Sequence, residues 1–134
     1  MNKIRVLVVD DSPVVRKQVS ELITMSPNIE VAAVAANGRL ALERLVHTSV
    51  DIIILDLEMP EMDGLETLRS LRKSCFDQPV VVFSSLTERG GALTLDALSL
   101  GASDYVTKPT AVGPSPVTVE NAGEALREKI LALC

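Results

Sequence analysis

Five short apolar runs alternate along this chain with five longer stretches of helical periodicity, and this alternation limits the folds it can adopt. The runs at residues 4–9, 52–55 and 80–83 are rich in β-branched side chains and almost continuous in hydrophobicity, and weaker runs cover 30–35 and 104–106. Strands without polar alternation are typical of a parallel sheet that helices cover on both faces. We therefore predict an α/β fold, a doubly wound five-stranded parallel sheet with five helices and right-handed crossovers.

Local signals mark the ends of several predicted helices. Ser12 is the predicted N-cap of the first helix, and Gly101 is the predicted end of the fourth. The last helix is expected to begin near residues 117–118. Residues 110–116 contain one glycine and two prolines and form a predicted spacer before that helix. No domain boundary is visible, so residues 1–134 are predicted to form a single domain.

The composition excludes several classes of function. Aromatic residues are 2% of the chain, and 13 basic against 18 acidic residues give a net charge of −5. We therefore expect no direct nucleic-acid partner, because both stacking platforms and a basic footprint are missing. The two cysteines lie outside any CxxC pair and indicate a reducing compartment. No apolar run approaches the roughly 18–20 residues that cross a bilayer, and no cleavage pattern follows the start, so we expect a cytoplasmic protein without membrane insertion.

Polar residues follow the carboxyl ends of four predicted strands. Asp10 and Asp11 follow the first strand, Asp56 the third, Ser84 the fourth and Lys108 the fifth. In an open parallel sheet, ligands bind outside these ends, at the point where the strand order reverses. We therefore expect three carboxylates, one hydroxyl and one ammonium group to converge on one edge of the sheet.

Carboxylates this close together require a cation. Two of them ~4 Å apart repel by about 4 kcal/mol at an effective dielectric constant of about 20. Oxygen ligands without cysteine or histidine favour Mg²⁺, with Mn²⁺ as the alternative. Such a metal recruits phosphoryl groups, whose oxygens Lys108 and Ser84 are suited to bind. Asp56, which stands alone on its strand, is then the candidate nucleophile that accepts a phosphoryl group.

Four segments give these residues a recognisable order: VVDDS at 8–12, LDLEMPEMDG at 55–64, SS at 84–85 and GASDYVTKP at 101–109. In order and spacing they resemble the receiver domain of two-component response regulators, and the resemblance covers the whole chain. It implies a flavodoxin-like fold with strand order 2-1-3-4-5. It also implies a phosphoprotein that takes a phosphoryl group from a histidine kinase in a Mg²⁺-dependent step.

The same resemblance gives each candidate residue a role. Asp56 is expected to be the phosphoacceptor, and Lys108 is expected to bind the phosphoryl oxygens. Ser84 and Tyr105 match the switch hydroxyl and the switch aromatic residue, with serine where threonine is commoner. The implied metal ligands are Asp10, Asp11, Asp56 and the backbone carbonyl of Glu58.

A narrower resemblance points to one branch of that family. FSSLTERG at 83–90 and the long connection after Lys108 and Pro109 are similar to the receiver of chemotaxis protein-glutamate methylesterases. In those proteins a C-terminal esterase domain with a Ser-His-Asp triad follows the receiver, and nothing in this chain resembles that domain. The resemblance implies a receiver without esterase activity of its own, in a hydrolase that continues past Cys134 and acts on chemoreceptors.

Other functions stay open on the sequence alone. A stand-alone receiver, or the receiver of a transcription factor, would share these motifs. A Mg²⁺-dependent phosphatase with an aspartate nucleophile carries a second aspartate two residues later, where this chain has Glu58. A flavodoxin-like cofactor module would need a phosphate-binding loop where Asp10 and Asp11 would repel phosphate. The sole histidine, His47, is predicted to lie on a solvated helix face, and it supplies neither a phosphohistidine nor a catalytic triad.

Overall fold

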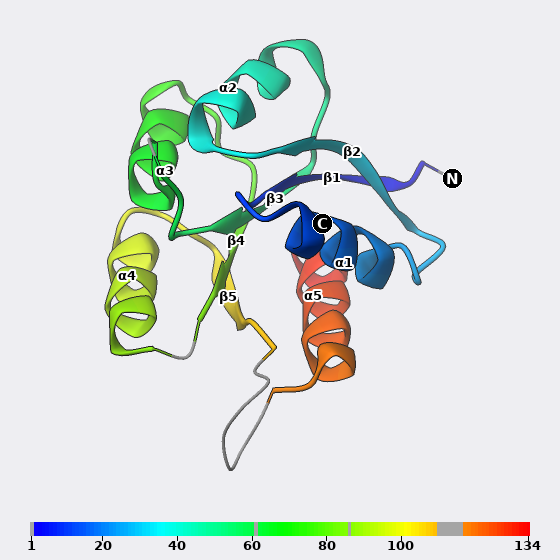
Figure 1. Ribbon diagram of the computed structural model, residues 1–134. Coiled ribbons are helices and arrows are strands. Elements are labelled where there is room, and N and C mark those ends of the chain that lie inside the picture. The colour runs from blue at the N-terminus through cyan, green and yellow to red at the C-terminus, as the bar shows by residue number, and fades with distance from the viewer. Residues whose placement is uncertain (1, 61, 86, 110–116) are drawn as a thin grey trace.

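A parallel sheet forms the centre of the computed structural model, which describes residues 2–60, 62–85, 87–109 and 117–134. Every strand pair is parallel, and the strands lie in the order β2-β1-β3-β4-β5 (Figure 1). The strands are β1 (Ile4–Val9), β2 (Ile29–Ala35), β3 (Ile52–Asp56), β4 (Val80–Ser84) and β5 (Asp104–Thr107). The predicted fold class and strand order are confirmed, and each strand lies within one residue of its expected bounds.

Five helices connect and follow the strands. They are α1 (Pro13–Ile23), α2 (Gly38–His47), α3 (Gly64–Lys73), α4 (Glu88–Ser99) and α5 (Val119–Leu133). Each follows a residue whose side chain accepts a hydrogen bond from the backbone of the first turn, namely Ser12, Asn37, Asp63, Thr87 and Thr118. None of the helices in the described ranges is long and apolar enough to cross a membrane.

Two helix boundaries show how the local signals act. The fourth helix ends at Ser99, with Leu100 as its C-cap, and Gly101 then takes the left-handed conformation at φ 104° that an ordinary side chain resists. The fifth helix begins at Val119, next to the predicted entry at 117–118. The predicted spacer at 110–116 lies outside the described residues.

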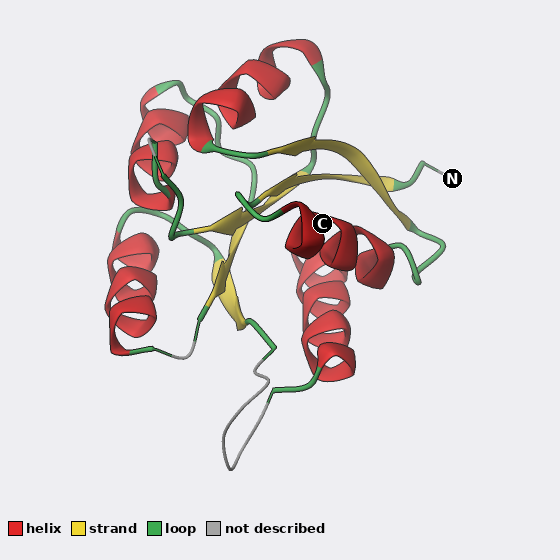
Figure 2. Cartoon of the chain, viewed as in Figure 1, coloured by secondary structure: helices red, strands yellow, loops and turns green. Residues whose placement is uncertain are grey.

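The helices form two layers, one on each face of the sheet (Figure 2). Buried residues of α1 and α5 share a core with Val6, Val8 and Phe83. Buried residues of α2, α3 and α4 share the other core with Leu7 and Leu55. Successive residues of a strand point to opposite faces, so a strand covered on both sides must be apolar throughout. The continuous apolar runs in the sequence reflect this double coverage.

The strand order places the candidate site. Strands β1 and β3 lie side by side, with Val9 opposite Leu55. The chain leaves β1 toward β2 on one side and reaches β3 on the other, so the order reverses here. Asp10, which follows β1, and Asp56, which ends β3, therefore meet at the carboxyl edge of the sheet.

Candidate functional site

Three carboxylates meet at the carboxyl edge of β1 and β3. Asp10, Asp11 and Asp56 each offer one oxygen, and these oxygens lie within 4.8 Å of one another. Asp10 and Asp56 are buried, each 3% exposed, whereas Asp11 is exposed. The structure thus brings together the three acidic residues that the sequence predicted.

Local backbone contacts fix the two buried carboxylates. The backbone N–H of Ser12 donates to Oδ1 of Asp10 at 2.9 Å, and that of Glu58 donates to Oδ1 of Asp56 at 3.2 Å. The guanidinium of Arg16 donates to the carbonyl of Asp10 at 2.7 Å and holds the loop from the other side. Each aspartate is therefore oriented by the loop that follows its own strand.

Lys108 connects the two buried carboxylates. Its Nζ lies 3.1 Å from Oδ1 of Asp56 and 3.2 Å from Oδ2 of Asp10. Its backbone N–H donates to the carbonyl of Ser84 at 2.8 Å, so the lysine is anchored to the end of β4. The ammonium group also lies 5.8 Å from the centre of the Phe83 ring. Lys108 thus occupies the position that the sequence predicted, within reach of any group bound at Asp56.

The charges of the cluster perturb one another. Burial, and then the negative charge of Asp10, raise the pKa of Asp56 to about 6, although Lys108 acts in the opposite direction. Burial also raises the pKa of Asp10. Burial lowers the pKa of Lys108, but the charges of Asp56 and Asp10 outweigh it, so this pKa lies above its usual value. One ammonium group does not fully compensate two buried carboxylates.

The donor set fits a hard divalent cation. Three carboxylate oxygens lie close together, with no cysteine or histidine among them. The buried Oδ2 of Asp10 lies near Lys108 but receives no well-directed hydrogen bond within the described part of the chain. Such an oxygen is available as a ligand, and an all-oxygen set suits Mg²⁺ or Mn²⁺. Glu58 follows Asp56 by two residues, so its backbone belongs to the same loop.

Ser84 ends β4 and is buried, 6% exposed. Its hydroxyl lies 2.9 Å from that of Thr94, a buried residue of α4 that was not predicted from the sequence. The signal was present, because the small residues Gly90, Thr94 and Ala97 are spaced by four and three and mark the helix face that packs closely on the sheet.

A second missed contact joins two loops above the site. The hydroxyl of Ser85 donates to the carboxylate of Glu58 at 3.0 Å and lies 3.0 Å from the hydroxyl of Thr87. The loop after β3 is thus connected to the loop after β4. No spacing rule in the sequence links residues 27 positions apart, which is why this contact was not predicted.

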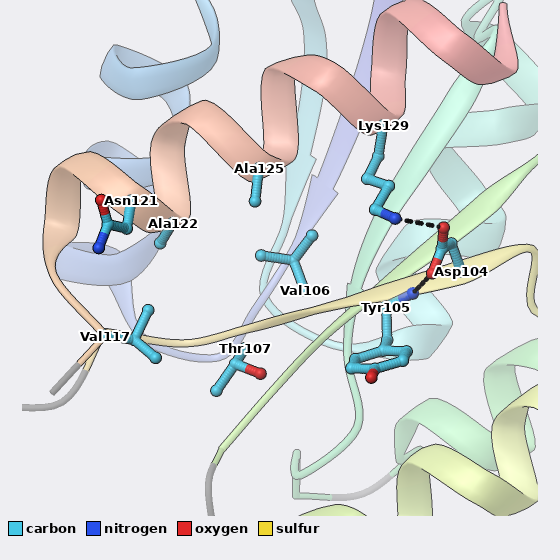
Figure 3. A pocket seen from close by; sticks show the side chains of 9 residues that line it. All are labelled: Asp104, Tyr105, Val106, Thr107, Val117, Asn121, Ala122, Ala125 and Lys129. Atoms are coloured by element: carbon cyan, nitrogen blue, oxygen red, sulfur yellow. Dashed lines mark hydrogen bonds and ion pairs between the residues drawn. The ribbon is translucent and has the colours of Figure 1, made fainter. Parts of the chain in front are cut away.

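Tyr105 lies apart from the acidic cluster. It is 48% exposed, and it lines a cavity of about 340 Å³ together with Ser84 and Thr94. Figure 3 shows Tyr105 and Val106 on opposite sides of β5, with Val106 toward α5. The ring is therefore on the surface, with a cavity between it and the predicted switch hydroxyl.

A second cavity, of about 440 Å³, lies between β5 and α5 (Figure 3). Lys129 and Asp104 form an ion pair across it, with Nζ 2.8 Å from Oδ2. The hydrogen bond from Lys129 lowers the pKa of Asp104. This pair joins the last helix to the edge strand.

Comparison with known proteins agrees with this fold and site. The family model described as the response regulator receiver domain matches residues 6–114, and the chain belongs to that family. As the narrower resemblance predicted, it is similar to the receivers of protein-glutamate methylesterases. It is 50% identical to a protein-glutamate methylesterase/protein-glutamine glutaminase of Nocardioides sp., over 99% of this chain and 36% of that protein. It is 46% identical to a protein of the same name from Trichodesmium erythraeum, over 100% of this chain and 38% of the relative.

A solved structure supports the same family assignment. The response regulator domain of Thermotoga maritima CheB matches with a TM-score of 0.85 at 38% identity, over 98% of this chain and 96% of that one. The chain thus spans little more than a third of the length of the curated relatives, and nearly all of a solved receiver domain.

Proposed function

We propose that this chain is a phosphoacceptor domain in which Asp56 takes a phosphoryl group from the phosphohistidine of a sensor kinase. The observation that carries the proposal is the buried pair of Asp56 and Asp10 bridged by Lys108, with Asp11 beside them. Two buried carboxylates in contact with one ammonium group are costly for a structure to keep, and such clusters occur where a charged ligand binds.

The transfer is a substitution at phosphorus. An Asp56 carboxylate oxygen forms a bond to the phosphorus as the bond from phosphorus to the histidine nitrogen breaks, and that nitrogen leaves with the electron pair and takes up a proton. Asp10, Asp11, Asp56 and the backbone carbonyl of Glu58 would hold Mg²⁺, or Mn²⁺, which neutralises charge on the phosphoryl oxygens when bound. Lys108 contributes a second positive charge to those oxygens.

The domain would report phosphorylation through its surface. The proposal assigns Ser84 to the new phosphoryl oxygens as a hydrogen-bond donor, and Tyr105 to the inward movement that follows. The cavity that both residues line lies between α4 and the ends of β4 and β5. A change at Asp56 would then alter what that surface contacts.

Phosphorylation by a small acyl phosphate tests the proposal without a kinase. With Mg²⁺, acetyl phosphate should add one phosphoryl group, seen by intact mass and removed by hydroxylamine. Asp56→Asn should add none, whereas Asp77→Asn, an exposed aspartate before β4, should react like the wild type. Lys108→Ala should still accept some phosphoryl group but fail to pass on the change. An adduct at normal yield in Asp56→Asn would contradict the assignment of Asp56.

We further propose that residues 1–134 form one receiver domain and that an esterase domain follows it in the native protein. The identity of 50% and 46% to proteins named as methylesterases, with coverage of little more than a third of their length, supports this arrangement. The phosphodonor would be a histidine kinase, and the substrates would be methyl esters of glutamyl residues on chemoreceptors, in the cytoplasm.

The esterase proposal has its own test. The 134 residues alone should hydrolyse no methyl ester, whereas the full gene product should do so several-fold faster when Asp56 is phosphorylated. The Asp56→Asn version of the full product should lose this stimulation and keep the basal rate. A gene that ends after Cys134, or continues into a helix-turn-helix domain, would contradict the esterase and leave the phosphoacceptor proposal intact.

A further inference from the structure

The hydroxyl of Ser84 is paired with the hydroxyl of Thr94. The two oxygens lie 2.9 Å apart, and Oγ1 of Thr94 also lies 2.7 Å from the carbonyl oxygen of Gly90, one turn earlier in α4. A hydroxyl has one proton to donate, and a carbonyl oxygen can only accept. Thr94 is the donor in both contacts, so its one proton is shared between the carbonyl of Gly90 and Oγ of Ser84. The Ser84 hydroxyl accepts this hydrogen bond and is thereby held against α4.

Close packing keeps α4 at this distance from the end of β4. A Cβ atom added to Gly90 would lie 2.5 Å from both the carbonyl oxygen and Oγ of Ser85, so the first turn of α4 approaches the strand end more closely than another residue would allow. Ser84 and Thr94 are 6% and 7% exposed. Water therefore competes poorly for the Ser84 hydroxyl, and the hydrogen bond from Thr94 determines the position of that hydroxyl.

Phosphorylation would draw the same hydroxyl in another direction. Under the proposed function, Ser84 donates to a phosphoryl oxygen on Asp56, while the described ranges contain no hydrogen bond between these two residues. On turning to the phosphoryl group, the Ser84 hydroxyl would leave the hydrogen bond that it accepts from Thr94. The two contacts therefore compete for the orientation of one side chain.

We propose that Thr94 is a positioning residue that holds Ser84 against α4 in the unphosphorylated domain and thereby sets how readily Ser84 turns to a phosphoryl group on Asp56. The proposal rests on the proposed function and adds a residue to it. Without the Thr94 hydroxyl, the unphosphorylated form loses a buried hydrogen bond that the phosphorylated form does not use. The equilibrium then shifts toward the phosphorylated conformation.

Beryllofluoride, an analogue of the phosphoryl group, measures this shift at equilibrium. We compare its affinity, in the presence of Mg²⁺, for the wild type, Thr94→Val and Thr94→Ser by calorimetry. A buried neutral hydrogen bond corresponds to a change in affinity of about 2- to 10-fold, so Thr94→Val should bind more tightly by that factor. Thr94→Ser keeps the hydroxyl and should bind like the wild type. Tyr105 is the only tyrosine of a chain without tryptophan, so its fluorescence gives a second readout.

Thr67 supplies a matched control. It is a buried threonine in α3 whose hydroxyl donates to the carbonyl of Asp63 at 2.7 Å, the same one-turn contact that Thr94 makes with Gly90. It has no second hydroxyl partner among the described residues. Thr67→Val therefore removes the same kind of hydrogen bond to a helix carbonyl without affecting Ser84. Its beryllofluoride affinity should equal that of the wild type.

A double-mutant cycle separates positioning from general effects on the fold. In a Ser84→Ala background, Thr94→Val should leave the affinity unchanged, because the hydrogen bond it removes no longer exists. A gain in affinity that persists in that background would overturn the proposal. Thr94→Ala, which removes the hydroxyl without a branched replacement, repeats the test if Thr94→Val folds poorly.

The two proposals fail in different ways. If the wild type binds beryllofluoride and Thr94→Val binds it equally or more weakly, the role of Thr94 is wrong and the phosphoacceptor function stands. If the wild type binds no beryllofluoride and accepts no phosphoryl group from acetyl phosphate, the proposed function is wrong, and the role of Thr94 is wrong with it.

Discussion

The charge of Asp56 is unfavourable where the fold places it. Burial and the charge of Asp10 raise its pKa to about 6, from a model-peptide value of 3.8, in spite of the contact with Lys108. A cation at this position would supply a positive charge beside the Asp56 carboxylate. A phosphoryl group would instead bond covalently to that carboxylate. At the scale of residues, the fold therefore keeps an unfavourable negative charge at Asp56, and ligand binding reduces this cost.

Neutralising Asp56 should stabilise the metal-free domain. A carboxyl group whose pKa is raised on folding contributes stability below its unfolded pKa, near 3.8, and this contribution is lost as the pH rises through about 6. With each pKa unit equal to about 1.4 kcal/mol, Asp56→Asn should raise the free energy of unfolding by about 1–3 kcal/mol at pH 7.5 and hardly at all at pH 4. Urea unfolding in EDTA at both pH values measures this, and a less stable variant at pH 7.5 would contradict it.

Mg²⁺ should bind at one site and depend on the exposed member of the acidic cluster. Loss of one carboxylate ligand, in Asp11→Ala, should weaken the affinity at least about tenfold, while Asp77→Ala should change nothing. Since a ligand of the folded state stabilises it, Mg²⁺ should raise the melting temperature of the wild type more than that of Asp11→Ala. Equal Mg²⁺ affinities for the wild type and Asp11→Ala would show that the site is elsewhere.

The residues of the candidate site could be predicted where a charged side chain directly follows an apolar strand. Asp10, Asp56 and Lys108 follow apolar strands, and the parallel sheet then brings their side chains together. Thr94 could not be found in this way, because it lies within a helix and acts through a contact that depends on the packing of α4 against β4. The exposure of Tyr105 also depends on packing, since sequence alone does not say which face of an edge strand is covered.

At the scale of elements, the fold was predictable because the central strands have unusually simple sequences. Residues of β1, β3 and β4 are buried on both faces, and their apolar runs have no competing explanation. The edge strand β2 is only partly buried, with Val34 39% exposed, so its hydrophobic signal is weaker. Two helix ends followed from local signals, the N-cap Ser12 of α1 and Gly101 after α4, because these residues act on the backbone next to them in the sequence.

Two glycines should respond oppositely to alanine. A Cβ at Gly64, where α3 begins, would lie 2.6 Å from both the carbonyl oxygen of Asp56 and Cα of Leu57, so the loop after β3 would have to move. Gly64→Ala should therefore cost about 1–3 kcal/mol. Gly91 in α4 has nothing within 4 Å, and Gly91→Ala should stabilise the domain by about 0.5–1 kcal/mol through helix propensity alone. Chemical unfolding of both variants checks the pair, and a stabilised Gly64→Ala would show that the loop is looser than described.

At the scale of the whole molecule, the acidic cluster and the surface around Tyr105 lie on different strands of the same sheet. The carboxylates lie at the carboxyl ends of β1 and β3, near the centre of the sheet, while Tyr105 and the cavity beside it lie at the β5 edge. Strand β4 lies between them, with Asp56 opposite Phe83 on one side and Ser84 opposite Thr107 on the other. A change at Asp56 can therefore reach the outer surface through one strand and the helix packed on it.

Locating the phosphoryl group on the chain tests the role of Asp56 most directly. After reaction with acetyl phosphate and Mg²⁺, borohydride reduces an aspartyl phosphate to homoserine, and mass spectrometry of the peptides identifies the altered residue. We expect homoserine at position 56 in the wild type, and none in Asp56→Asn or in the absence of the divalent cation. Homoserine at another aspartate, or an unmodified Asp56 in a protein that binds Mg²⁺ normally, would contradict this role.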